Sequence, residues 1–242
     1  MGLYPGARIQ VVSSDSRGAL VKLFSGQADM AIIARDVAAD EKTAAKEGGA
    51  DLRVFRIAID GIAFIAHPEN PVEGLSLEQA AGLLDGRLRS WAEVGGEDLP
   101  VIPVLRDRNS GTYEVVREKA LGGSEFTEGP FCRSTQEVID RVASNRASIG
   151  CAGLAWLGRG RVKALQIAEA PDSAYLGPTA SSVYRNRYPV RRPILACVIN
   201  YQTESTPRAG FLTFLTSSRG QTVVEMEGLV PNKVPDRIVQ LD

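Results

Sequence analysis

Short apolar runs alternate along the chain with segments in which apolar residues recur at helical spacing. The runs have the length of strands and cover residues 9–12, 30–33, 61–66, 101–105, 148–152 and 194–199. After the first run, Leu20, Leu23 and Phe24 fall on one stripe of a predicted helix. This alternation of strands and helices is typical of an α/β protein with mixed, mostly parallel sheets flanked by helices.

Helix starts and chain crossings give the predicted organisation. Ser76 with Gln79 and Ser134 with Glu137 have the spacing of capping boxes, each of which predicts a helix start. Two proline-containing segments, 68–71 and 188–193, are the expected crossings between two lobes. The predicted lobes are residues 1–67 plus 193–242 and residues 68–192, with a hinge where the chain crosses twice.

Composition limits the classes of function. The 242 residues are 44% hydrophobic and 24% charged, as in soluble globular proteins. A net charge of −1 offers no broad attraction to nucleic acid or to an anionic membrane, so any anion specificity must be local. We expect no direct membrane insertion, since no stretch approaches the roughly 20 apolar residues that span a bilayer. Residues 1–5 lack the basic start and apolar core of a secretory signal, so we expect a trimmed leader or a cytosolic chain.

The cysteines and the single histidine predict no cofactor and no metal. Cys132, Cys151 and Cys197 are too few and too widely spaced for a disulfide framework, and apolar neighbours favour buried free thiols. His67 precedes Pro68 at the end of an apolar strand and has no histidine or cysteine close to it in the sequence. We therefore expect His67 to cap a turn instead of binding a metal.

The turn at 106–112 carries the chemistry that points to function. It joins an apolar strand to a helix-like run, and Ser110 or Asn109 is the expected N-cap. Free backbone N–H groups at a helix N-terminus form an anion site. Gly111 would let an oxygen of the anion approach the backbone closely, and the hydroxyls of Ser110 and Thr112 would add hydrogen-bond donors. Arg106, at the end of the strand, can hold two oxygens with its planar guanidinium. The alternative is an ordinary capped turn with surface arginines.

The turn at 13–18 has the same layout of strand, hydroxyl-rich loop, glycine and amphipathic helix. Ser16 is the strongest candidate donor, with Ser14 and Arg17 as additional candidates. Two such turns are what an anion-binding cleft between two lobes requires. Ligands of open α/β sheets gather at the carboxyl ends of the strands, where both turns are expected.

Ordered segments over nearly the whole chain resemble the phosphate-binding proteins of Pst-type ABC importers. The segments are 60–68 with 70–72, 75–79 with 85–91 and 94–96, Arg106 with 110–112, 147–155, 188–193, and 211–220 with 228–231. The resemblance implies a two-lobed periplasmic-binding-protein-like fold of type II. It further implies capture of phosphate or a related tetrahedral oxyanion, delivery to a membrane permease, a periplasmic or extracytoplasmic location, and no enzymatic activity. Carried over by position, Arg106, Ser110, Gly111 and Thr112 would contact the anion from one lobe and Ser16 from the other.

Three departures from the family pattern affect the expected site. The family has a strand, a donor-bearing loop and a helix before the segment that begins here at Tyr4, so we expect this first strand and helix to be missing. Ala34 stands where the family places serine or aspartate, and its side chain can neither donate nor accept a hydrogen bond. Arg35, next to it, and Arg17 could add positive charge near the cleft.

Two other classes of function stay open from the sequence. The first keeps the fold as a scaffold, sensor or adhesion module with a degraded anion site, which Ala34 favours. The second is an enzyme with Ser110 or Ser16 as nucleophile. A serine nucleophile needs a base, and the only histidine, His67, belongs to the far end of a different strand. The sequence contains no phosphate-binding P-loop and no dinucleotide-binding glycine motif.

Overall fold

The computed structural model describes residues 8–170, 172–201 and 206–233. Its elements in chain order are α1 (Ser16–Phe24), β1 (Ala31–Ile33), α2 (Ala39–Glu47), β2 (Leu52–Ala66), β3 (Gly74–Ser76), α3 (Leu77–Asp85), η1 (Trp91–Val94), β4 (Ile102–Arg106), α4 (Gly111–Lys119), β5 (Phe131–Cys132), α5 (Thr135–Ser144), β6 (Ser148–Gly153), η2 (Leu154–Arg159), β7 (Lys163–Ala164), β8 (Gln166–Ala168), α6 (Ala180–Tyr184), β9 (Arg191–Ile199), α7 (Pro207–Thr216), α8 (Ser218–Met226) and β10 (Val230–Pro231). Tyr4, where the family-like pattern begins, and residues 1–5, in which a secretory signal was sought, lie outside the described residues.

The main sheet has the strand order β1-β9-β2-β6-β4-β5, with β7 and β10 also pairing with β2. The α/β class is confirmed, and the sheet is mixed. Parallel pairing is confined to β4 with β5, β4 with β6, and β3 with β8. Every described pairing of β2 and β9 is antiparallel. The expected predominance of parallel pairing is therefore wrong, because a chain that crosses out and returns along the same line places its two crossing strands antiparallel.

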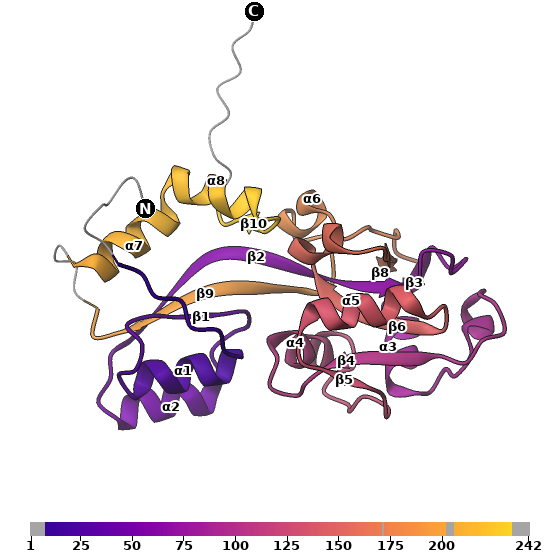
Figure 1. Cartoon of the computed structure of the whole chain (residues 1–242), viewed down its shortest axis with the longest axis horizontal. Coiled ribbons are helices and arrows are strands. Elements are labelled where there is room, and N and C mark those ends of the chain that lie inside the picture. The colour runs from indigo at the N-terminus through magenta and orange to yellow at the C-terminus, as the bar shows by residue number, and fades with distance from the viewer. Residues whose placement is uncertain (1–7, 171, 202–205, 234–242) are drawn as a thin grey trace, which may run out of the picture.

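Strand β2 belongs to both halves of the molecule, and β9 runs beside it (Figure 1). Its residues 52–61 pair with β9, and its residues 62–66 pair with β6. The change of partner between Gly61 and Ile62 divides the fold into two lobes, the first with α1, α2, α7 and α8 and the second with α3 to α6. The predicted lobe limits, residues 1–67 plus 193–242 and residues 68–192, stay a prediction. The change of partner lies a few residues before the predicted limit at Pro68.

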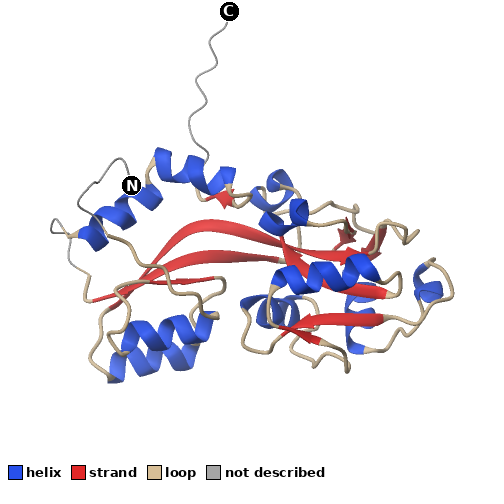
Figure 2. Cartoon of the chain, in the orientation of Figure 1, coloured by secondary structure: helices blue, strands red, loops and turns tan. Residues whose placement is uncertain are grey.

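Helices cover both faces of the sheet in the first lobe (Figure 2). Leu20 and Leu23 of α1 pack with Ile33 of β1 on one face. Leu212 of α7 and Val224 of α8 pack with the strands on the opposite face. In the second lobe, the apolar faces of α3 and α4 share one cluster with the buried half of β2, whereas α5 packs on the other side with Val104. The turn at 106–112 follows β4, whereas the turn at 13–18 precedes α1 and lies beside the end of β1 through the hydrogen bond from the N–H of Ala34 to Ser16.

Most predicted elements are present, and two differ. Residues 9–12 form no strand, because no described strand pairs with them and their side chains are exposed. The capping box of Ser76 and Gln79 is confirmed, with both reciprocal hydrogen bonds formed. Ser134 caps α5 by accepting from the N–H of Glu137, but the Glu137 carboxylate accepts from the N–H of Arg133, one residue earlier than a capping box requires.

Candidate functional site

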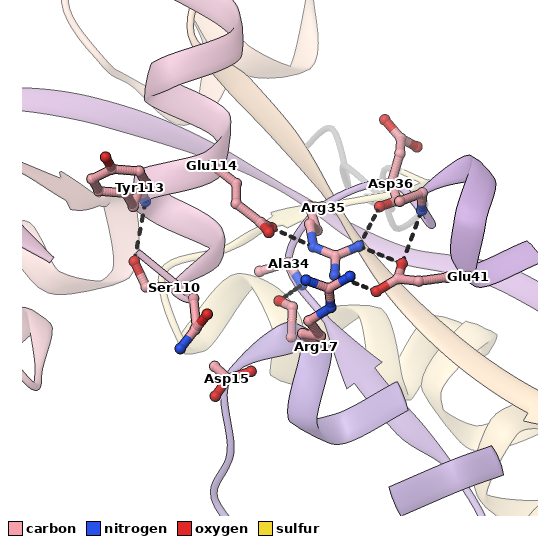
Figure 3. A network of polar contacts seen from close by, with 12 residues as sticks. Asp15, Arg17, Ala34, Arg35, Asp36, Glu41, Ser110, Tyr113 and Glu114 are labelled. Carbon is pink, nitrogen blue, oxygen red and sulfur yellow. Dashed lines mark hydrogen bonds and ion pairs between the residues drawn. The ribbon is translucent and has the colours of Figure 1, made fainter. Parts of the chain in front are cut away.

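The two hydroxyl-bearing turns lie against each other where the lobes meet. A Cβ added to Gly111 would lie 3.1 Å from Ser16 Oγ and 3.2 Å from the carbonyl oxygen of Ala34. The start of α4 in the second lobe thus contacts both the start of α1 and the end of β1 in the first (Figure 3). A side chain at this position would require its neighbours to move by a few tenths of an ångström, so glycine suits this close approach. The expected convergence of the two turns is present in the structure.

Local hydrogen bonds explain why both helices begin at this junction. Asp15 is the N-cap of α1, and its carboxylate accepts from the N–H of Gly18 at 2.7 Å. Ser110, as expected, is the N-cap of α4, and its Oγ accepts from the N–H of Tyr113 at 3.1 Å. Two positive helix ends therefore face the same junction, an arrangement that favours negative charge between them.

Three buried hydroxyls at the junction share one hydrogen-bonding state. Ser16, Ser110 and Thr112 are 7%, 3% and 5% exposed. Each oxygen accepts one hydrogen bond from a group that can only donate: Ser16 Oγ from the N–H of Ala34, Ser110 Oγ from the N–H of Tyr113, and Thr112 Oγ1 from Arg192. Within the described residues no acceptor is recorded for the proton of any of the three. Each hydroxyl is therefore available as a donor.

Arg106, the last residue of β4, lies next to β5 and the start of α5. Its guanidinium donates to the carbonyl of Cys132, to Thr135 Oγ1 at 3.1 Å and to the carboxylate of Asp107 at 3.2 Å. With Thr112 it lines a cavity of about 10 Å³, which is the space of a single water position. The structure thus brings Arg106 next to Thr112 but engages its nitrogens with protein oxygens. Its contact with an anion stays a prediction.

Two of the additional candidates are exposed and interact with other side chains. Ser14 is exposed, and its Oγ accepts from the ammonium of Lys22 on α1 at 3.4 Å. Arg17 forms a surface ion pair with Asp40, in which both side chains are more than 60% exposed. An exposed pair of this kind contributes little to a buried site because water screens it.

Arg35 is buried beside the junction and is held by two carboxylates (Figure 3). Its terminal nitrogens donate to both oxygens of Glu41 at 2.8 and 2.7 Å, and its Nε pairs with Glu114 of α4. The hydrogen bond with Glu41 raises the pKa of Arg35, despite the opposing effect of burial. Arg35 supplies no uncompensated positive charge to the junction, since the carboxylate of Glu41 alone balances it.

The two carboxylates respond to burial in opposite directions. Burial alone would raise the pKa of Glu41, but hydrogen bonds from Arg35 and from the N–H of Ala38 outweigh it and lower that pKa. Burial raises the pKa of Glu114, and the attraction of Arg35 compensates only in part. Glu114 is thus the carboxylate of this cluster that takes up a proton more readily.

Sequence reasoning missed three charged residues around the site: Glu114, Asp60 and Arg192. Arg192 of β9 donates to Thr112 and forms a buried ion pair with Asp60 of β2. Asp60 was detectable in principle, because it is a charged residue inside the apolar run of β2 and such a residue requires a buried partner. The identity of that partner depends on strand pairing, which the local pattern does not give.

The expectations for His67 and the cysteines can be compared with the structure directly. His67 Nδ1 accepts from the N–H of Glu69, which confirms the turn-capping role. Cys132, Cys151 and Cys197 are free and buried, as expected. Across the described ranges, no group of three or more histidine, cysteine or acidic residues could hold a metal ion.

The fold and the junction define a class: a two-lobed binding protein whose lobes share strand β2 and face each other with polar turns. Comparison with known proteins agrees. A profile of the PBP superfamily domain matches residues 1–219. The phosphate-binding protein PstS of Borreliella burgdorferi is 31% identical over 230 residues, covering 90% of this chain and 79% of that protein. The PstS protein of Bacillus subtilis is 29% identical, covering 94% and 72%.

A solved structure gives the same answer. A phosphate ABC transporter substrate-binding protein from Clostridium perfringens, solved with bound phosphate, matches with a TM-score of 0.77 and 27% identity, covering 90% of this chain and 85% of that one. The chain belongs to the PBP superfamily and, within it, to the family of PstS phosphate-binding proteins. No helix in the described part of the chain is long and apolar enough to cross a membrane.

Proposed function

We propose that the chain binds phosphate, or a related tetrahedral oxyanion, between its two lobes and delivers it to the membrane permease of an ABC importer. The proposed ligand contacts are Ser16 from the first lobe and Ser110, Gly111 and Thr112 from the second, with Arg106 as the cationic group. The phosphate-binding relatives and the phosphate-bound neighbour support the choice of ligand. The proposed location is periplasmic or extracytoplasmic.

One observation carries this proposal: three buried hydroxyl protons, from two separate turns, have no acceptor among the described residues. A buried donor without an acceptor costs free energy of about 1–3 kcal/mol, so a guest rich in acceptor oxygens would stabilise the closed junction. A phosphate oxygen accepts from hydroxyls and from backbone N–H groups alike. The guest shifts the lobes toward closure only through contacts that it makes to both turns at once.

Binding without chemistry is the proposed mode of action. The Ser110 hydroxyl caps α4 by accepting from the N–H of Tyr113, and among the described residues it has no hydrogen bond with a basic side chain. The imidazole of His67 is used by the turn that follows β2. A serine nucleophile would need a base close to its own oxygen, so the local geometry supports capture and release over catalysis.

Isothermal titration with inorganic phosphate tests the proposal. We expect the unaltered protein to bind phosphate, and Ser16→Ala to weaken binding by roughly tenfold, the effect of one lost hydrogen bond to a charged group. The exposed neighbour Ser13 provides a matched control, and Ser13→Ala should bind like the parent. Arg106→Ala should abolish binding without unfolding the protein, since it removes a charged contact and little of the core.

Two outcomes would contradict parts of this proposal. Absence of binding heat for the unaltered protein, with both phosphate and sulfate, would favour the scaffold or sensor with a degraded site. Unchanged phosphate affinity in Arg106→Ala would instead leave the capture function in place and remove Arg106 from the site.

A further inference from the structure

A buried ion pair links the shared strands to the candidate anion turn. Asp60 of β2 and Arg192 of β9 are directly opposed in the antiparallel register. Arg192 donates from Nε at 3.0 Å and from Nη2 at 2.9 Å to the same oxygen of Asp60. The other oxygen of Asp60 accepts from the N–H of Leu154 at 2.9 Å. The charge of Arg192 is thus balanced by a carboxylate that is itself fixed on two sides.

The remaining terminal nitrogen of Arg192 reaches out of this pair to α4. Its Nη1 donates to Thr112 Oγ1 at 3.0 Å. A guanidinium has five N–H donors and no acceptor, so the Thr112 oxygen must accept in this contact. The single proton of Thr112 is then directed to a different partner, and no acceptor for it is recorded between residues 8 and 233 in the described ranges.

We propose that Arg192 is a positioning residue, which holds the Thr112 hydroxyl in the orientation that donates to the bound anion. The inference rests on the proposed phosphate-binding function. A hydroxyl without such a contact rotates freely and can present either its proton or a lone pair. Arg192 removes that choice before the ligand arrives, and a donor fixed in advance binds more tightly because less freedom is lost on binding.

The neutralised charge of Arg192 separates this role from a direct attraction of the anion. Both side chains of the ion pair are buried, at 10% and 3% exposure, and Asp60 occupies two of the guanidinium nitrogens. The direct electrostatic attraction between Arg192 and the anion would therefore contribute less to affinity than the orientation of the Thr112 hydroxyl. The proposal predicts that Arg192 acts on affinity only while a hydroxyl is present at position 112.

A double-mutant cycle tests this dependence. Phosphate affinity is measured by titration calorimetry for the parent, Arg192→Lys, Thr112→Val and the double variant. The lysine keeps a cation for Asp60 but lacks the fork that reaches Thr112 as well. We expect each single change to weaken binding by roughly tenfold to a hundredfold. The double variant should be no weaker than Thr112→Val alone, which shows that both changes act through one contact.

Further variants separate positioning from a structural role. Thr112→Ser retains a hydroxyl at position 112. In this variant, Arg192→Lys should again weaken phosphate binding, as it does in the parent. Arg191→Lys is the matched control, since strand alternation places this neighbour on the opposite face of β9, and it should bind like the parent. If Arg192→Lys does not fold, the combined variant Asp60→Asn with Arg192→Gln, which removes both charges together, replaces it in the double-mutant cycle.

Each result decides the inference. A double variant weaker by the product of the two single losses would overturn it, because Arg192 would then act through the strands and independently of Thr112. Parent-like affinity of Arg192→Lys would overturn it as well. A parent protein that fails to bind phosphate would reject the proposed function and this inference with it, an outcome distinct from additive losses in a protein that binds.

Discussion

Arg35 and Glu114 form an ion pair between the end of β1 and the first turns of α4, and so connect the two lobes beside the candidate site (Figure 3). Arg35 also holds Glu41 in its own lobe through two hydrogen bonds. The second carboxylate is thus not needed to neutralise the guanidinium. It adds a negative charge to a junction that we propose to receive an anion.

The stability of the protein should therefore depend on pH through Glu114. Burial raises the pKa of Glu114 above the value of about 4.3 expected in the unfolded chain. A carboxyl whose folded pKa is raised contributes stability that is present below the unfolded pKa and is lost as pH rises through the folded pKa. Glu114→Gln removes this loss, so its melting temperature relative to the parent should rise with pH across that window and then level off.

Thermal unfolding followed by circular dichroism between pH 4 and 8 measures the difference. The control is Glu118→Gln, an exposed position on the same helix, whose difference from the parent should stay flat. A Glu114→Gln curve that falls relative to the parent with rising pH would show that attraction to Arg35, and not burial, dominates at Glu114.

Gly111→Ala should weaken phosphate binding more than it weakens folding. The added Cβ would lie 3.1 Å from Ser16 Oγ and 3.2 Å from the carbonyl of Ala34, so it acts as a wedge between the two turns. The lobes can relieve this contact by opening slightly, which separates the proposed ligand contacts. Titration with phosphate and a melting curve measure the two effects.

The control for this wedge is Gly210→Ala in α7, where an added Cβ meets nothing within 4 Å. That variant should keep the parent's phosphate affinity. Equal affinity of Gly111→Ala and the parent would mean that ligand binding does not require the turns to approach as closely as they do here.

Gly153→Ala should destabilise the fold itself. Its backbone is in an ordinary extended conformation, but the added Cβ would lie 2.5 Å from the Asp60 carboxylate, which Arg192 and the N–H of Leu154 hold in place. Overpacking of this kind costs about 1–3 kcal/mol. The urea midpoint measures the loss, and Gly158→Ala, where a Cβ meets open space, should show none.

The three cysteines should be unreactive in the folded protein. Burial raises the pKa of Cys151 to about 12 and that of Cys197 to about 11, and it also raises the pKa of Cys132. The thiolate is the reactive form, so at pH 8 almost none is present. Mass spectrometry after iodoacetamide should find no label in the native protein and three labels in denaturant. Rapid labelling of any cysteine in the native state would contradict its burial.

The sequence predicted the features that depend on local patterns. The strand at β4, the N-cap at Ser110 and the capping box at Ser76 follow from neighbours within a few residues, and all three are present. The first half of β2 was missed because Arg53 and Arg56 interrupt its apolar pattern. Residues 9–12 have a strand-like pattern but no pairing partner in the described sheet, and a strand exists only by pairing.

The candidate site divides in the same way. The position of Ser16, Ser110, Gly111 and Thr112 at two helix starts was predictable because a helix start with hydroxyls is a local pattern, whereas their contact with an anion stays a prediction. The engagement of Arg35 with Glu114, and of Arg192 with Thr112, joins residues about 80 positions apart and depends on how the lobes meet. The balance of charges at the junction therefore could not be predicted from local sequence patterns. Arg35 was expected as a possible source of positive charge near the cleft, but Glu41 neutralises it.

The passage of strand β2 from one lobe into the other limits the movement that the molecule can make. Strand β2 is not interrupted where its partner changes from β9 to β6, so at this crossing the halves are joined by extended backbone and not by a slack loop. A change in the angle between the halves therefore requires β2 itself to bend or twist near Gly61 and Ile62, where its partner changes.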